Sequence, residues 1–462
     1  MGAIDYFFKP RSVAVIGASR ERGKIGNAIF ENFVSGKFRG KVYPVNPKAK
    51  QVLGVKCYKS VKDIPTGVDL AVIVVPSLVV KKVMQDCAEK RVKACVIITS
   101  GFSEVGNKKL EDEIALIAKN AGMRVIGPNC LGVFDAFTNV DTLFLPVKKL
   151  GRPKRGTISF ISQSGAVGSI VLDWMASKGY GVSKFVSYGN AVDVNETKMI
   201  AYLAHDKTTR VICAYLEGVK DGRLFMRVAE RAVKKKPIIV LKGGRTKAGS
   251  KAVSSHTGSL AGSDAVYDAA FRQCGVIRAK DLTEMFTFAR VLSEQPLPKG
   301  NRIAVVTNGG GFGVLAADET IFKSLRLAEL SERSRRVLSK VIPSYGGIHN
   351  PVDLVGDAGD DRYKRALDVL EKDDNVDAVL CILLFQTATI TPSVIDHVVR
   401  FAKRRKKPIV VCSAGGKYTG EMARRLEEHG IPVFDTPSLG IDALDALVDY
   451  SNIKRGREWT YE

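Results

Sequence analysis

The sequence lacks the features that mark membrane and secreted proteins. It has no apolar run close to the roughly 20 residues that cross a bilayer. Its first residues, MGAIDYFFKP, show neither the basic-then-apolar order of a signal peptide nor the Ser or Thr that myristoylation requires after Met-Gly. From these absences we expect a cytoplasmic protein that does not bind membranes.

Cysteine and histidine are scarce, and neither forms a recognisable cluster. The eight cysteines contain no C-x-x-C pair, and most lie in apolar, strand-like runs such as VICAYL and AVLCILLF. This pattern is typical of buried free thiols and argues against a disulfide framework or a zinc site. No two of the five histidines have metal-ligand spacing, so we expect no metal held by this chain.

Positive charge is the one composition feature that is strongly out of balance. The formal net charge is +23, so a nucleic-acid partner has to be weighed. The basic residues are dispersed, however, and the short runs at 233–237 and 403–407 each precede an apolar segment, as cations do at helix ends. No nucleic-acid recognition motif is present. A polyanionic small ligand or an acidic partner chain would use the same positive field, and we expect no nucleic acid.

Short β-branched runs alternate with amphipathic segments along the whole chain, which is typical of βα units and parallel sheets. Basic or proline-containing stretches at 146–156 and 293–301 have the composition of linkers. We therefore predict an α/β protein with three domains, at residues 1–145, 155–293 and 301–462. The expected strands are 12–19, 41–47, 70–76, 94–101 and 124–130, then 157–165, 182–190, 211–218 and 237–244, then 302–311, 376–385, 408–416 and 431–437.

The ends of the expected strands are polar and rich in glycine, and ligands of open α/β sheets bind beyond these carboxyl ends. After the first strand, Gly17 permits a tight turn, and N–H groups at the following helix start can hold a phosphate. The turn is not G-x-G-x-x-G, and the second strand ends in NPKAK without the acidic residue that binds a ribose, which counts against NAD. A lone glycine turn is also common where it only connects a strand to a helix.

Several motifs of the first block occur together: SVAVIGAS, GKIG, VYPVNP, TSGFSE and GPNCLG. In combination they resemble the CoA-binding domain of the NDP-forming acyl-CoA synthetases, which include succinyl-CoA synthetase. The resemblance implies a Rossmann-like domain in which Lys24 and Lys48 neutralise CoA phosphates. The implied CoA site comprises Gly17, Ala18, Ser19, Lys24, Ile25, Asn46, Pro47, Lys48, Val75, Pro76, Ser77, Ser100, Gly101, Phe102, Asn129 and Cys130.

His256 lies in SSHTGSLAG, a small-residue segment without a hydrophobic period, whereas a core histidine normally has apolar or periodic neighbours. A nucleophilic histidine needs a partner for its second nitrogen and an electrophile that is held still. Glu217, at a strand end, could be that partner, although a lone glutamate there is also common at a surface. The helix start at Ser164 offers N–H groups for phosphoryl oxygens. The Gly and Ser content of residues 247–262 suits a flexible loop, although a static, ordered loop has the same composition.

The second block resembles the second domain of the same synthetases. The resemblance implies that His256 is phosphorylated during turnover, that Glu217 supports it, and that Gln163, Ser164 and Gly165 form the anion-binding helix start. The third block repeats the strand–turn–helix plan, and its turn could present a second helix start to the same phosphate through Asn308, Gly309, Gly310 and Gly311. Such a turn is also common as a structural feature.

The motif NPVDLVGD (350–357) follows in the manner of the synthetases' C-terminal ligase domain. The order of blocks resembles the α subunit of archaeal ADP-forming acetyl-CoA synthetases (acetate–CoA ligases). This implies a Rossmann-like CoA-binding domain followed by two flavodoxin-like parallel-sheet domains. The implied reaction interconverts acyl-CoA, ADP and phosphate with acid, ATP and CoA, through acyl phosphate and phosphohistidine. A synthetase for another acid (succinate, a branched-chain or an aryl acid) and a non-catalytic CoA-responsive regulator remain alternatives.

The sequence contains no P-loop and no segment resembling an ATP-grasp module. The resemblance therefore implies that ADP or ATP, with Mg²⁺, binds a separate, smaller ATP-grasp β subunit. It also implies an α₂β₂ heterotetramer.

Overall fold

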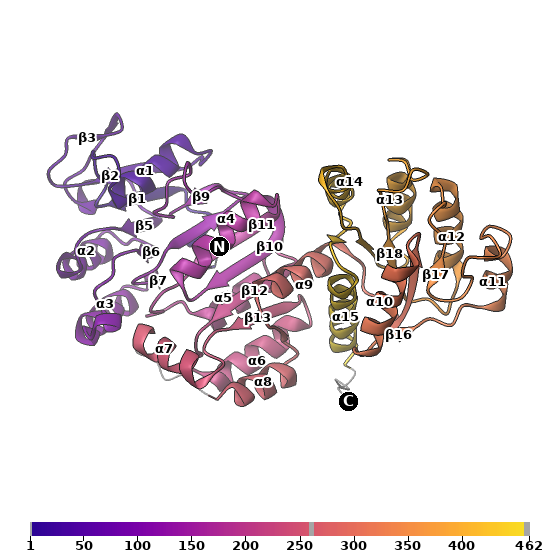
Figure 1. Cartoon of the computed structure of the whole chain (residues 1–462). Helices are drawn as coiled ribbons and strands as arrows, with labels where there is room; N and C mark the ends of the chain where they lie inside the picture. The colour runs from indigo at the N-terminus through magenta and orange to yellow at the C-terminus, as the bar shows by residue number, and fades with distance from the viewer. Residues whose placement is uncertain (1, 258–262, 457–462) are drawn as a thin grey trace. The chain divides into compact units, whose positions relative to one another are not determined.

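The computed structural model describes residues 2–257 and 263–456, without the side chains of residues 254–257. The chain forms two compact units, Met1–Ala279 and Lys280–Glu462. Three sheets of mainly parallel strands, each flanked by helices, confirm the predicted α/β class (Figure 1). Within the described ranges, no helix combines the length and the apolar character that crossing a bilayer requires.

The first sheet is five-stranded and parallel, in the order β2-β1-β5-β6-β7. Strands β1 (SVAVI) and β5 (LAVI) are fully buried and almost entirely aliphatic, as expected where helices cover both faces. Alternate side chains of the sheet share a core with Met84 of α2 and Ile114 of α3. The elements are η1 Asp5–Phe7, β1 Ser12–Ile16, α1 Ile25–Ser35, β2 Lys41–Val45, β3 Gln51–Val52, β4 Val55–Lys56, η2 Val61–Asp63, β5 Leu70–Ile73, α2 Ser77–Glu89, β6 Ala94–Ile97, η3 Ser103–Val105, α3 Lys108–Asn120 and β7 Arg124–Ile126.

The second sheet is seven-stranded, in the order β14-β13-β12-β10-β11-β8-β9. Its five parallel strands carry helices α4 to α8, and β8 and β9 add an antiparallel edge. The elements are β8 Gly132–Asp135, β9 Val140–Asp141, β10 Lys154–Ser162, α4 Gly165–Ser177, β11 Gly181–Ser187, α5 Glu196–Leu203, β12 Val211–Leu216, α6 Gly222–Val233, β13 Ile238–Lys242, α7 Lys247–Thr257, α8 Asp264–Gln273 and β14 Ile277–Ala279.

Strands β8, β9 and β14 lie outside the segments expected for the second sheet, and β10 begins before its expected segment. Strand β8, in the range predicted for the first domain, pairs Gly132 with Ser187 at the end of β11. Strand β10 begins at Lys154, inside the stretch expected to be a linker. The local sequence could not predict β8 or the start of β10, because both form by pairing with β11. The three domain ranges stay predictions.

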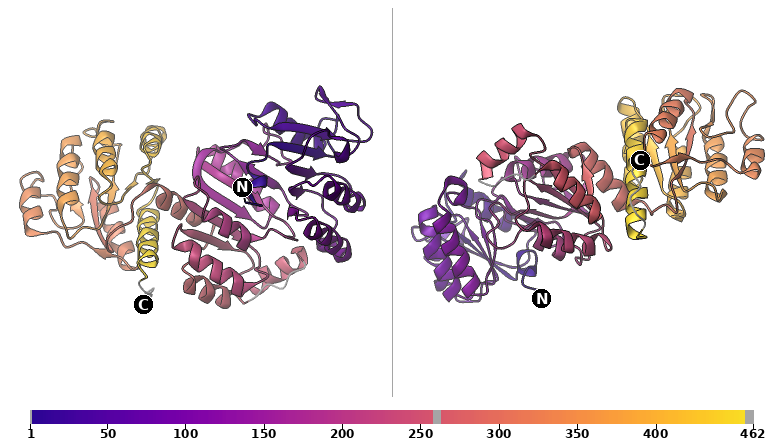
Figure 2. Two further views of the ribbon diagram at one scale, coloured as in Figure 1. Left: turned by 180° about the vertical axis from the view of Figure 1, so that it is seen from behind. Right: turned by 90° about the horizontal axis from the view of Figure 1, so that it is seen from below.

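The second unit contains a six-stranded sheet in the order β16-β15-β18-β19-β20, with β17 paired to β15. Successive strand residues face opposite sides: Val379 and Cys381 join a core with α12 and α13, whereas Leu380 lies against Gly440 of α15. Figure 2 shows the helices on both sides of this sheet. The elements are α9 Leu282–Glu294, β15 Arg302–Thr307, α10 Gly310–Ile321, β16 Arg326–Leu327, α11 Glu332–Leu338, β17 Val352–Asp353, α12 Asp360–Lys372, β18 Ala378–Ile382, α13 Val394–Arg404, β19 Ile409–Cys412, α14 Lys417–Glu428, β20 Val433–Phe434 and α15 Pro437–Lys454.

The basic runs at 233–237 and 403–407 do lie at helix ends, because α6 ends at Val233 and α13 ends at Arg404. All three sheets also share one topology. In each, the first parallel strand has the next strand of the chain on one side and a later strand (β5, β12 or β18) on the other, so the strand order reverses beside it. These reversal points, at β1/β5, β10/β12 and β15/β18, are where α/β sheets open a crevice for ligands.

A buried lysine ties β11 to β8 and to the loop after α5. The Lys184 ammonium lies 2.9 Å from the Asp206 carboxylate and 3.3 Å from that of Asp135, and it donates to Thr208 Oγ1 at 2.8 Å. Burial alone would raise the pKa of Asp206, but hydrogen bonds from Thr209, Lys184 and Thr208 lower it to about 2. The cluster therefore stabilises the fold above about pH 4, and this contribution fades as the pH falls towards 2.

We predict that Lys184→Met lowers the free energy of unfolding by about 3–5 kcal/mol, since two buried carboxylates lose their cation. Chemical denaturation monitored by circular dichroism would measure the loss. Lys178→Met, at the exposed end of α4, is the matched control and should change stability by less than about 0.5 kcal/mol. Equal stability of the two variants would contradict the role given to this cluster.

Candidate functional site

The reversal point of the first sheet brings the turn after β1 against the end of β5. Gly17 has φ +98°, and a Cβ there would lie 2.2 Å from the Val74 carbonyl oxygen. Only glycine permits this approach, because the conformation and the missing side chain are both required. The turn leads into α1 at Ile25, and the end of β5 leads into α2 at Ser77. Two helix N-termini therefore open beside one crevice.

The reversal point of the second sheet is tied by a glutamine. Gln163, after β10, accepts through Oε1 from the backbone N–H groups of Glu217 at 2.8 Å and Gly218 at 3.1 Å, after β12. Ser164 caps α4, and its Oγ accepts from Val167 N at 3.3 Å. Lys242 Nζ donates to the Glu217 carbonyl at 2.8 Å. The predicted helix start and the predicted carboxylate thus lie at adjacent strand ends.

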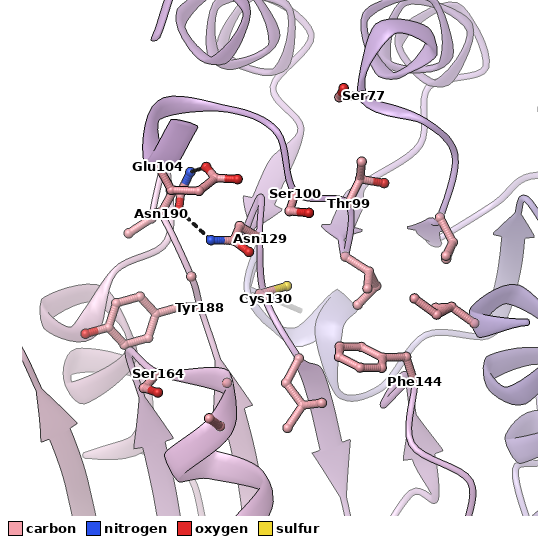
Figure 3. Close-up of a pocket in the computed structure, with 18 of the residues that line it drawn as sticks. Ser77, Thr99, Ser100, Glu104, Asn129, Cys130, Phe144, Ser164, Tyr188 and Asn190 are labelled. Carbon is pink, nitrogen blue, oxygen red and sulfur yellow. Dashed lines mark hydrogen bonds between the residues drawn. The ribbon is translucent and has the colours of Figure 1, made fainter. Parts of the chain in front are cut away.

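One cavity of about 1180 Å³ extends along both reversal points. Figure 3 shows Asn129 and Cys130 at its centre, with Ser77, Thr99 and Ser100 towards one end and Ser164 and Tyr188 towards the other. The structure therefore brings ten residues predicted for CoA together with Gln163, Ser164, Gly165 and Glu217 around one cavity. The predicted residues that line it are Gly17, Ser19, Lys24, Ile25, Val75, Pro76, Ser77, Ser100, Asn129, Cys130, Gln163, Ser164, Gly165 and Glu217.

Six residues predicted for the CoA site do not line this cavity: Ala18, Asn46, Pro47, Lys48, Gly101 and Phe102. Phe102 is buried in the core of the first sheet. Asn46 shapes the turn instead, because its amide donates to Ala18 O at 2.8 Å and accepts from Lys48 N at 2.9 Å. These positions were predicted because they belong to the motifs. A motif does not show which of its side chains shape a turn and which face the cavity.

Sequence reasoning missed several residues on the cavity wall, among them Thr99, Glu104, Tyr188, Asn190, Glu196 and Lys220. Tyr188 and Asn190 belong to the expected strand end YGN, whose polar-glycine pattern was the available signal. Glu196 begins α5, and Lys220 lies three residues after Glu217. Nothing local in the sequence distinguishes these last two from surface charges.

The ionisable side chains of the cavity wall differ in their charge at neutral pH. Burial raises the pKa of Glu196, and burial together with Glu196 raises the pKa of Tyr188 well above its ordinary value. Burial also opposes ionisation of Glu104, but hydrogen bonds from Asn190 and Gly101 hold its pKa below the usual range. At neutral pH, therefore, Glu104 is anionic and the Tyr188 phenol is protonated.

The expected loop at 247–262 is wrong over its first part, because residues Lys247–Thr257 form helix α7. Thr246 Oγ1 accepts from Gly249 N at 3.0 Å, which caps the helix start, and Val253 is buried. The cap and the Lys and Ala residues that follow favour a helix that the serines and glycines masked. His256 belongs to the last turn of α7, but its side chain and residues 258–262 lie outside the described residues.

The glycine turn of the third sheet belongs to the second unit. The Asn308 amide is used within the fold: its Oδ1 accepts from Leu384 N and from Tyr363 OH, both at 2.9 Å, and its Nδ2 donates to Thr387 Oγ1 at 3.2 Å. Gly309 caps α10 and also donates its N–H to Thr307 Oγ1. The first backbone N–H groups of α10, at Gly310 and Gly311, are what this turn offers an anion.

Across residues 2–257 and 263–456, no group of three or more His, Cys, Asp or Glu side chains is arranged to hold a metal ion. Cys130 is the thiol on the cavity wall. Burial raises its pKa to about 12, and its Sγ donates to Ile97 O at 3.3 Å. It is therefore a neutral thiol and no nucleophile at pH 7.

Family models match almost the entire chain. A CoA binding domain matches residues 11–136, a succinyl-CoA ligase like flavodoxin domain residues 155–292, and a ligase-CoA domain residues 303–446. Each match contains most of the strands of one sheet, although β8, at the end of the first match, pairs into the second sheet.

Related proteins match along nearly the whole of this chain. The chain is 44% identical over 454 residues to the α subunit of acetate–CoA ligase (ADP-forming) II from Pyrococcus furiosus, covering 96% of this chain and 97% of that one. It is 37% identical to the 4-hydroxybutyrate–CoA ligase (ADP-forming) of Nitrosopumilus maritimus, covering 96% of this chain but 64% of that protein. The solved structure of acetyl-coenzyme A synthetase 1 from Ca. Korarchaeum cryptofilum, in complex with phosphate and ADP, superposes with a TM-score of 0.92 at 39% identity, over 98% of this chain and 97% of that one. The chain therefore belongs to the family of ADP-forming acyl-CoA synthetases, in which it corresponds to the α subunit.

Proposed function

We propose that this chain is the α subunit of an ADP-forming acetate–CoA ligase, and that its cavity binds acyl-CoA at one end and phosphate at the other. The observation that carries the proposal is the joining of two sheet reversal points in one cavity of about 1180 Å³. The end with Gly17 and Ser77 suits the CoA phosphates, and the α4 N-terminus at Gly165 suits a transferred phosphoryl group. Acetate is the acid named for two of the three relatives described above.

The proposed reaction begins when a phosphate oxygen attacks the thioester carbonyl carbon. The C–S bond breaks, the CoA sulfur takes a proton, and acyl phosphate remains. A ring nitrogen of His256 then attacks the phosphorus atom, and the carboxylate leaves with the bridging oxygen. In the last step an oxygen of the ADP β-phosphate attacks the phosphohistidine, which forms ATP and frees the histidine. Glu217 supports the histidine by holding its second nitrogen and offsetting the positive charge of the phosphoimidazole.

The third step needs a nucleotide site, and we propose that a smaller ATP-grasp subunit supplies it in an α₂β₂ assembly. Mg²⁺ would bind there with ADP and neutralise phosphate charge. The relative from N. maritimus is longer than this chain, which covers 64% of it, so it has room for further domains on one polypeptide. We also propose a cytoplasmic location, which the eight free and buried cysteines support.

We predict that His256→Ala abolishes acid-labile phosphoryl labelling and ATP formation while CoA binding stays within about twofold, because the acceptor nitrogen is lost and the CoA end is untouched. Labelling with acetyl-CoA and ³²P-phosphate in the presence of the partner subunit would measure the first effect, and calorimetry with CoA the second. His205→Ala, which changes an exposed histidine after α5, is the control. A His256→Ala chain that still yields ATP would overturn the assignment.

We further predict that Glu217→Gln slows phosphohistidine formation about 10–100-fold, the range seen when a carboxylate that orients a histidine is lost. Rapid-quench labelling of the complex would give the rate. The amide has nearly the shape of the carboxylate, and the Gln163 and Lys242 bonds go to the backbone of residue 217, so the loop keeps its geometry. Glu230→Gln on α6 should leave the rate unchanged. Equal rates for Glu217→Gln and wild type would remove this glutamate from the mechanism.

A further inference from the structure

Asn190 stands where the loops of the two sheets in the first unit touch. It follows Gly189, which has φ +55° and leaves room for the neighbouring chain, since a Cβ there would lie 2.2 Å from Asn129 O. The Asn190 backbone N–H donates to Pro128 O at 3.0 Å. The segment after β11 is therefore pressed directly onto the turn that carries Asn129.

The Asn190 side chain bonds to three acceptors on η3 and α3. Its Nδ2 lies 2.6 Å from Glu104 Oε2, 2.8 Å from Glu111 Oε2 and 3.2 Å from Ser103 Oγ. Its Oδ1 accepts from Asn129 Nδ2 at 3.4 Å (Figure 3). One amide thus joins η3, α3 and the turn after β7. It also supplies donors between two carboxylates that would otherwise face each other.

These partners shape both ends of the cavity. Glu104 Oε1 accepts from Gly101 N at 2.6 Å and Phe102 N at 3.2 Å, which fixes the loop that follows Ser100. Helix α7, which carries His256, lies against η3. On the other side, Lys220 Nζ donates to the Asn190 carbonyl at 2.9 Å, so the segment after Glu217 is held by the same residue.

We propose that Asn190 is a positioning residue for the reaction: its amide holds the 100–105 loop and Asn129 in the arrangement that binds CoA, and it fixes η3 as the surface on which α7 lies. The inference rests on the proposed function. It adds to that function a role for one side chain. Asn190, which follows a strand of the second sheet, aligns the CoA end of the cavity with α7, the helix that carries His256.

Asn190→Asp tests the donor directly, because it replaces the amide by a third carboxylate next to Glu104 and Glu111. We expect CoA to bind the variant about 30-fold more weakly than wild type at pH 8, since bonds to charged groups are lost and repulsion is added. A proton shared among three carboxylates restores an O–H donor. The ratio of the two dissociation constants should therefore fall to about threefold or less at pH 5.5. Titration calorimetry of the full chain with CoA at both pH values gives the ratio.

A second variant exchanges the amide of residue 190 and the carboxylate of residue 111. Asn190→Asp with Glu111→Gln keeps one amide and two carboxylates at the same three positions. It should recover CoA affinity at pH 8 to within about threefold of wild type, because a donor again lies between acceptors. Thermal melting of both variants shows whether each is folded. If the single variant is unfolded, the CoA affinity of the double variant tests the proposal.

Asn195→Ala is the matched control. Asn195 lies in the same segment and caps α5 by accepting from Lys198 N at 3.1 Å, outside the cavity wall. It should lower the melting temperature without changing CoA affinity. In the complex with the partner subunit, Asn190→Asp should raise KM for CoA and lower kcat, whereas a purely structural role would reduce only the folded fraction.

The outcomes separate the two proposals. If the wild-type chain does not bind CoA, the proposed function fails. If wild type binds CoA but Asn190→Asp binds it equally well at pH 8, or its deficit is the same at pH 5.5, the role of Asn190 is overturned. Failure of the exchanged pair to recover affinity while folded overturns it as well.

Discussion

Residues 127–131 carry the chain from the carboxyl end of β7 in the first sheet to the carboxyl end of β11 in the second, where β8 begins antiparallel. This short crossing forces the two ligand-binding edges to face each other, because each edge lies at the carboxyl ends of its parallel strands. The single cavity along both edges and the Asn190 contacts between the two sheets depend on this crossing.

The same strand order occurs in all three sheets, but the three reversal points are used differently. The turn after β1 depends on a glycine that meets a carbonyl oxygen, the turn after β10 on a serine cap and a glutamine, and the turn after β15 on an asparagine already bonded inside its own fold. Only the first two line one cavity in the first unit. The shared topology therefore gives each sheet a crevice at the same position, and the side chains of each turn decide what that crevice can bind.

The strands and the polar glycine turns could be predicted because their signals are local. Buried runs such as Val211–Leu216 and turns such as the one at Ser164 show themselves within ten residues. The pairing of β8 with β11, the Lys184 cluster and the contacts of Asn190 could not, since each joins residues 22 to 87 positions apart. Helix α7 was missed for another reason: its serines and glycines suggested a loop, while the Thr246 cap and buried Val253 support a helix. Ala18 and Phe102, which were predicted for the CoA site, do not line the cavity, because a motif also contains residues that only shape a turn.

The neutral thiol of Cys130 has a chemical consequence for a thioester bound in this cavity. A cysteine on the wall could capture an acyl group by thioester exchange, which would divert the substrate onto the protein. Burial raises the pKa of this thiol to about 12, so the thiol is protonated at neutral pH. With acyl-CoA in the cavity as proposed, the burial that places Cys130 against the Ile97 carbonyl would also protect the site against self-acylation.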